Sequence, residues 1–105
     1  MYFTSDTPSL HRDAGALPDV LQMANFKTEP EKELNLLKQL QPNKPAMVME
    51  YWTGWFDHWL EPYHSTEPVD EFADVLERIL SFPSSVNFYM FHGGTTFGFM
   101  NGAKI

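Results

Sequence analysis

Glu50 stands where an apolar segment of the chain gives way to an aromatic one. The apolar residues 46–49 precede it, and the letters YWTGW follow it. In parallel α/β enzymes, a carboxylate at the carboxyl end of a strand is a common position for a catalytic group. Glu50 is therefore a candidate catalytic residue, and the alternative is a structural glutamate that binds a helix terminus or an arginine. If strict strand alternation holds, Val48 and Glu50 share one face and Met49 and Tyr51 share the other.

Aromatic residues are concentrated directly after this glutamate. All three tryptophans of the chain, Trp52, Trp55 and Trp59, follow Glu50 within nine residues, and Phe56 lies among them. Aromatic rings pack against the apolar C–H faces of sugars, so a carboxylate among such rings indicates a carbohydrate site. The alternative is a local hydrophobic cluster that holds a long loop in place.

Other residues with reactive side chains match no known catalytic or metal-binding spacing. His58 and His64 lie near Asp57 and Glu61, but their spacing fits no metal motif with a mechanical rationale. The glycines of residues 92–102 lack the lysine of a phosphate loop and are better suited to tight turns. We therefore expect neither a metal nor a cofactor.

Composition narrows the class of protein. The chain has 105 residues, of which 43% are hydrophobic and 20% charged, which is typical of a globular protein. A net charge of -7 with only seven Lys and Arg argues against a nucleic-acid partner. The absence of cysteine excludes disulfides and thiolate chemistry within the chain. No apolar run approaches the ~20 residues that a membrane span needs, and the compartment stays open.

The elements that would position Glu50 alternate between strand and helix. The apolar patterns predict two helices, one at residues 30–41 behind a capping box of Thr28 and Glu31, and one that begins near Thr66 and Pro68. Residues 5–19 fit neither class and predict an irregular connection. Four strand-like segments complete the pattern, at residues 2–4, 20–26, 46–52 and 86–92. The order predicts a parallel α/β architecture, with the long segments 53–65 and 93–104 at the carboxyl ends of its strands.

Two segments closely resemble glycoside hydrolase family 35, above all its animal β-galactosidase-1-like members. They are KPAMVMEYWTGWFDHW at residues 44–59 and SVNFYMFHGGTTFGFMNGA at residues 85–103. The first is similar to the family's strand seven and the second to its strand eight. FTSD at residues 3–6 and LPDVLQMANF at residues 17–26 are similar to strands five and six. The resemblance covers essentially the whole chain.

The resemblance implies a role for three residues. Glu50 would be the nucleophile of a retaining β-galactosidase, Tyr89 a residue that hydrogen-bonds the sugar, and Trp55 a wall of its pocket. Residues 60–63 and Thr96 depart from the family's usual glycine and asparagine, which leaves the preferred galactoside open. The family would also place the protein in the lysosome or outside the cell.

The same resemblance predicts that part of the catalytic machinery lies outside this chain. A retaining glycosidase uses two carboxyl groups about 5 Å apart. The family's acid/base glutamate belongs to an N-E-Y motif on strand four, and this chain contains no such motif. We therefore expect a partial (β/α)8 barrel, strands five to eight with two crossover helices over residues 1–105. Its partner would be the missing N-terminal half, and its substrate a β-galactoside. The alternative is a non-catalytic carbohydrate-binding or interaction module that uses the aromatics of residues 52–59.

Overall fold

The described part of the chain forms one parallel sheet. The computed structural model describes residues 2–94 and residue 98. Four strands pair in the order β1-β2-β3-β4, and every neighbouring pair is parallel. Their bounds are β1 Phe3–Asp6, β2 Leu21–Phe26, β3 Met47–Trp52 and β4 Ser85–Tyr89. The predicted parallel α/β class is confirmed, and each predicted strand overlaps an observed one.

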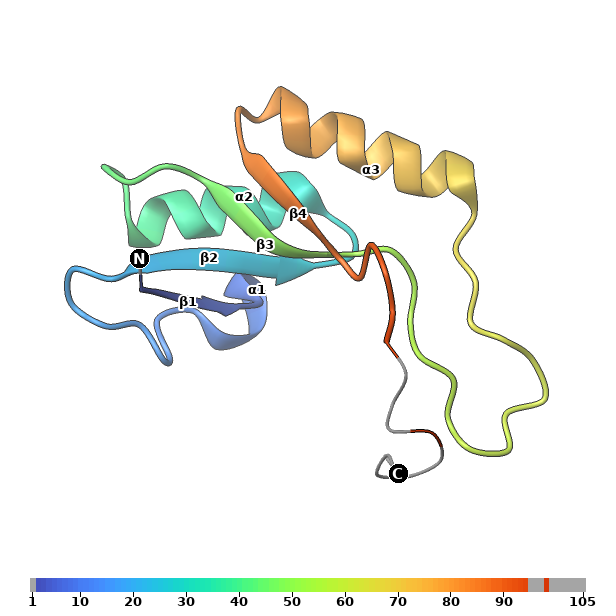
Figure 1. Cartoon of the computed structure of the whole chain (residues 1–105). Coiled ribbons are helices and arrows are strands. Elements are labelled where there is room, and N and C mark those ends of the chain that lie inside the picture. The colour runs from blue at the N-terminus through green and yellow to red at the C-terminus, as the bar shows by residue number, and fades with distance from the viewer. Residues whose placement is uncertain (1, 95–97, 99–105) are drawn as a thin grey trace.

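Three helices connect the strands. They are α1 Pro8–His11, α2 Pro30–Leu40 and α3 Val69–Ser81. The two longer helices match the predicted ones, and the short α1 lies within the segment predicted to be irregular. Helices α2 and α3 lie along the same face of the sheet, as Figure 1 shows. No helix of the described residues is long and apolar enough to cross a membrane.

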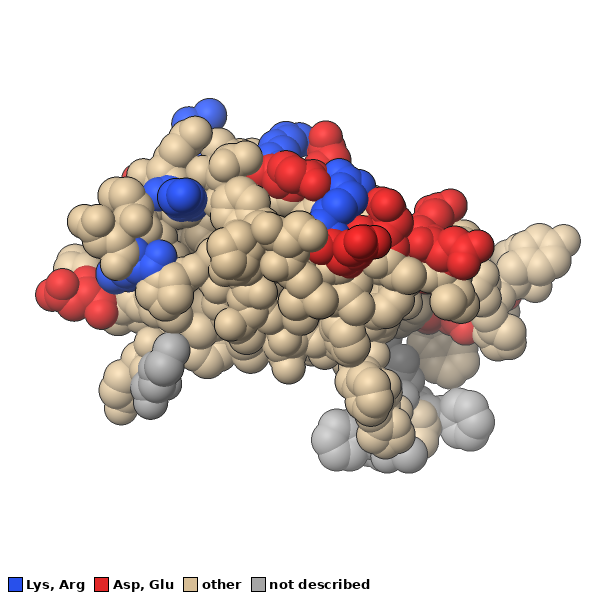
Figure 2. All heavy atoms as spheres, turned by 90° about the horizontal axis from the view of Figure 1, so that it is seen from above, with Lys and Arg blue, Asp and Glu red and all other residues tan. Residues whose placement is uncertain are grey.

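The predicted capping box at the start of α2 is wrong. Glu29 is the N-cap residue, with a left-handed backbone (φ 55°) and no side-chain cap. Pro30 begins the helix without a free N–H, which lessens the need for a cap. Glu31 instead accepts hydrogen bonds at 2.8 and 2.6 Å from the guanidinium of Arg78 in α3. Figure 2 shows acidic and basic side chains intermixed over this side of the molecule.

The core lies between the sheet and these two helices. Tyr51 is its largest buried side chain, and it stacks on Phe72 of α3 with the ring centroids 4.9 Å apart. Its hydroxyl donates a hydrogen bond to the Phe72 carbonyl at 2.7 Å. Burial raises the pKa of Tyr51 to about 12, so the hydroxyl keeps its proton. The buried apolar residues of this cluster are Ala24, Phe26, Leu34, Leu37, Val48, Tyr51 and Ile79.

An extra residue in β3 breaks the strand alternation that the sequence suggests. Ala24 pairs with Val48 but the next residue, Asn25, pairs with Glu50, so between these two pairs β3 contains one residue, Met49, that has no counterpart in β2. Val48 and Tyr51 therefore both reach the helix side, three positions apart. The expectation that Val48 and Glu50 share a face is wrong, because a β-bulge shifts the side-chain phase by one residue.

We predict that Ile79→Ala lowers the free energy of unfolding by about 2–5 kcal/mol, because a buried aliphatic side chain leaves a cavity. Ile79 is 0% exposed, whereas its neighbour Leu80 is 55% exposed. Leu80→Ala is therefore the matched control, with an expected cost below about 1 kcal/mol. Chemical denaturation under identical conditions measures both changes. Equal losses would contradict the placement of the core under α3.

Candidate active site

The candidate site lies at the carboxyl ends of β3 and β4. Because the strands are parallel, these ends meet at one edge of the sheet, as Figure 1 shows. Trp52, the last residue of β3, pairs in register with Tyr89, the last residue of β4. Tyr51 and Phe88 pack on the helix side, so their neighbours Glu50, Trp52 and Tyr89 project from the opposite face.

Glu50 is held by a neighbour on its own strand. The indole Nε1 of Trp52 donates a hydrogen bond to Oε2 of Glu50 at 3.0 Å. The bond restrains one carboxylate oxygen, and no hydrogen bond to Oε1 is found among the described residues. A carboxylate with one restrained oxygen and one available oxygen can act as a nucleophile or as a base.

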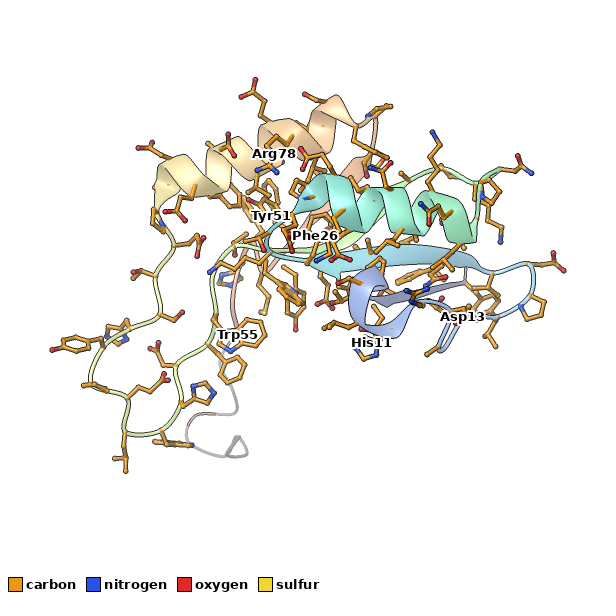
Figure 3. All side chains as sticks on the ribbon, turned by 180° about the vertical axis from the view of Figure 1, so that it is seen from behind. His11, Asp13, Phe26, Tyr51, Trp55 and Arg78 are labelled. Carbon is orange, nitrogen blue, oxygen red and sulfur yellow. The ribbon has the colours of Figure 1, made fainter. Side chains whose placement is uncertain are left out.

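A series of aromatic contacts leads away from this carboxylate. The ring of Trp52 meets Trp55 edge to face at 5.5 Å, and Trp55 stacks on Phe56 at 5.2 Å. Trp55 and Phe56 are 47% and 48% exposed. Figure 3 shows Trp55 at the start of the long loop, away from Tyr51 and Phe26 beneath the helices. Exposed rings beside a carboxylate suit the apolar face of a sugar.

The backbone joins the ends of the two strands beyond the sheet. The N–H of Thr53 donates to the Tyr89 carbonyl at 3.4 Å, and its hydroxyl donates to the Met90 carbonyl at 2.9 Å. Tyr89 itself is about half exposed. The structure thus brings Glu50 and Trp55 together through Trp52, and it places Tyr89 beside the same tryptophan.

Two asparagines of the site were not predicted to belong to it. Asn25 pairs with Glu50 across β2 and β3, and its buried Oδ1 has no hydrogen-bond partner among the described residues. Asn87 donates a hydrogen bond to the Met49 carbonyl at 3.0 Å. Strand alternation along the sequence does place Asn87 on the same face as Tyr89, but it does not identify the hydrogen-bond partner of Asn87. Thr96 and the predicted loop from residue 95 onward, except residue 98, lie outside the described residues.

The histidines of the long loop pair with carboxylates. Nδ1 of His58 lies 2.8 Å from Glu61, and Nδ1 of His64 lies 2.6 Å from Asp57. The bond to His64 lowers the pKa of Asp57, and the same pair raises the pKa of His64. No group of three or more His, Cys, Asp or Glu side chains in the described part of the chain could hold a metal ion.

The loop is also tied to the sheet by charge. Lys27, which follows β2, forms an ion pair with Glu67, which precedes α3. Together with the Asp57 and Glu61 pairs, this contact restrains the segment, in which none of residues 53–66 is buried. Each exposed pair contributes at most about 1 kcal/mol, so the loop is held by several weak contacts.

The chain is similar to β-galactosidases over most of its length. It is 45% identical over 105 residues to the β-galactosidase of Xanthomonas manihotis. The aligned region covers 99% of this chain and 17% of that protein. It is 46% identical over 91 residues to human β-galactosidase-1-like protein 2, covering 85% of this chain and 14% of the relative. Human β-galactosidase is 41% identical over 92 residues, or 86% of this chain and 13% of its own length. The chain thus spans 13% to 17% of the length of these curated relatives.

The family model agrees with the pairwise comparisons and with the fold. All of residues 1–105 match the model described as glycosyl hydrolases family 35. The match includes Glu50, the aromatic residues beside it and Tyr89, so it covers the whole candidate site. The chain belongs to glycosyl hydrolase family 35.

Proposed function

We propose that this chain is the C-terminal half of the catalytic barrel of a retaining β-galactosidase-like enzyme, with Glu50 as the nucleophile. The observation that supports it most is the placement of Glu50 at the carboxyl edge of a parallel sheet, bound by Trp52 and followed by exposed aromatic rings. The names of the relatives, which include β-galactosidases, support a terminal β-linked galactose as the substrate. A lysosomal or secreted location is proposed from family resemblance alone.

In the proposed reaction, an oxygen of Glu50 attacks the anomeric carbon while the bond from this carbon to the leaving oxygen breaks. A second carboxylic acid, from the other half of the barrel, protonates that leaving oxygen. The resulting galactosyl ester on Glu50 is then hydrolysed by water, which the second carboxylate deprotonates. The hydrogen bond from Trp52 orients the attacking carboxylate, and the ring of Trp55 forms a wall of the pocket.

A non-catalytic carbohydrate-binding module is the second candidate, because the aromatics of the long loop are exposed. Trp55, Phe56 and Trp59 each retain about half of their accessible surface. Such a module would bind galactosides without forming an ester. The two functions differ in one observable, which is a covalent galactosyl adduct.

We predict that a 2-fluoro-galactosyl label in the full-length enzyme attaches to Glu50, as peptide mapping by mass spectrometry would show. Glu50→Gln should lower turnover by several orders of magnitude, because it removes the residue that forms the ester. Glu61→Gln is the matched control, since Glu61 is a loop carboxylate bound to His58. A label on Glu61, on Glu67 or on a residue outside residues 1–105 would refute the assignment.

We predict that Tyr89→Phe lowers kcat/KM by a factor that corresponds to a loss of roughly 1 to 3 kcal/mol of transition-state stabilisation. The substitution removes a hydroxyl that binds the sugar and keeps the aromatic ring. Tyr63→Phe, at a largely exposed loop position, should leave the kinetics unchanged. Steady-state hydrolysis of an aryl β-galactoside measures both variants. Equal kinetics of Tyr89→Phe and wild type would make Tyr89 a packing residue.

We predict that the 105-residue chain expressed alone lacks galactosidase activity and self-associates. Loss of general acid help costs about 10²- to 10⁴-fold, and the sugar contacts from the other half of the barrel are lost as well. The outer edges of β1 and β4 have no partner strand in the described sheet, and such edges favour association. Aryl β-galactoside hydrolysis and light scattering test both statements. A monodisperse monomer that hydrolyses the substrate with retention would refute them.

A further inference from the structure

The bulge in β3 lies directly before Glu50 and is seen from both neighbouring strands. Against β2, the residues opposite Ala24 and Asn25 are Val48 and Glu50, so Met49 is skipped. Against β4, Val48 pairs with Val86 and Tyr51 pairs with Phe88. Asn87 is the single residue between Val86 and Phe88, and it lies opposite two residues of β3.

Packing on the helix side explains why the extra residue is present. Val48 and Tyr51 are both fully buried in the same core, and strict alternation would send residues three apart to opposite faces. Inserting one residue satisfies both burials and turns Glu50 to the open face. Bulges commonly occur beside active sites, where they change the direction of a side chain.

The bulge also leaves a backbone group in need of a partner. Met49 has no partner residue in the register of either neighbouring strand, and an unpaired peptide group enclosed in a barrel would be costly. The side chain of Asn87 supplies a donor at this point, because its Nδ2 donates a hydrogen bond to the Met49 carbonyl at 3.0 Å and also lies 3.5 Å from the Phe88 carbonyl. This carbonyl belongs to the peptide unit that also contains the N–H of Glu50.

We propose that Asn87 is a positioning residue for Glu50. Its amide holds the Met49–Glu50 peptide in the bulged conformation and thereby fixes where the carboxylate points. The inference rests on the proposed role of Glu50 as nucleophile. Asn87 acts through the backbone of the neighbouring strand and not through contact with the sugar. Its loss therefore affects the chemical step more than substrate binding.

The test replaces Asn87 in the full-length enzyme with two residues of similar size that lack the donor. Asn87→Leu is neutral, and Asn87→Asp presents a carboxylate to the Met49 carbonyl. We expect both to lower kcat and the rate of 2-fluoro-galactosyl labelling by about 10- to 100-fold, because small misplacements of a reacting group have effects of this size. KM and inhibition by galactose should change less than about 3-fold, because the sugar contacts remain.

Asn35→Leu and Asn35→Asp are the matched controls, since Asn35 is exposed on α2 on the other side of the sheet. Wild-type rates in both Asn87 variants, or a loss confined to KM, would overturn the proposal. If one Asn87 variant does not unfold cooperatively, the kinetics of the other variant test the proposal. If both variants misfold, Asn87 is required for folding and the proposal that it positions Glu50 is overturned. Peptide mapping of the wild-type label separates the two claims. A label away from Glu50 refutes the proposed function, whereas a label on Glu50 with unaffected Asn87 variants refutes only this inference.

Discussion

One extra residue in the third strand determines how the two faces of this sheet are used. Val48 and Tyr51 are both required by the core under the helices, and they are compatible only because β3 bulges at Met49. The same bulge turns Glu50 away from that core. The direction of the candidate nucleophile is thus a consequence of hydrophobic packing on the opposite side of the sheet, which contributes far more free energy than any single polar contact at the site.

The two faces consequently have different physical roles. On the helix side, the buried ring of Tyr51 stacks on Phe72, and its hydroxyl donates a hydrogen bond to the Phe72 carbonyl. These contacts hold α3 against β3. Exposed ion pairs such as Arg78 with Glu31 join α3 to α2 but add little to stability. On the open face, polar and aromatic groups stand at the strand ends. The packed side holds the backbone under these groups rigid, which fixes their positions relative to one another.

Much of the architecture was predictable because its signals are local. The apolar stripe of α3 and the continuous apolar run of β3 identify both elements from periodicity and length. Two local signals failed. Thr28 and Glu31 have the form of a capping box, yet Glu31 binds Arg78, which is 47 residues away along the chain. The alternation of β3 failed because a bulge is decided by burial on the far side of the sheet and leaves no mark on the residue types.

The sequence by itself determined the alternation of strands and helices and the candidate Glu50, since these follow from patterns of residue types along the chain. It also determined the family and the candidates Trp55 and Tyr89, which the resemblance of two segments implies. Only the tertiary structure decided that Trp52 donates to Glu50 and that Asn87 donates to the backbone of the neighbouring strand. A hydrogen bond depends on distance and direction in space, which strand register and packing establish. The positions of the groups around the carboxylate therefore follow from how β3 and β4 align, and residue order does not specify that alignment.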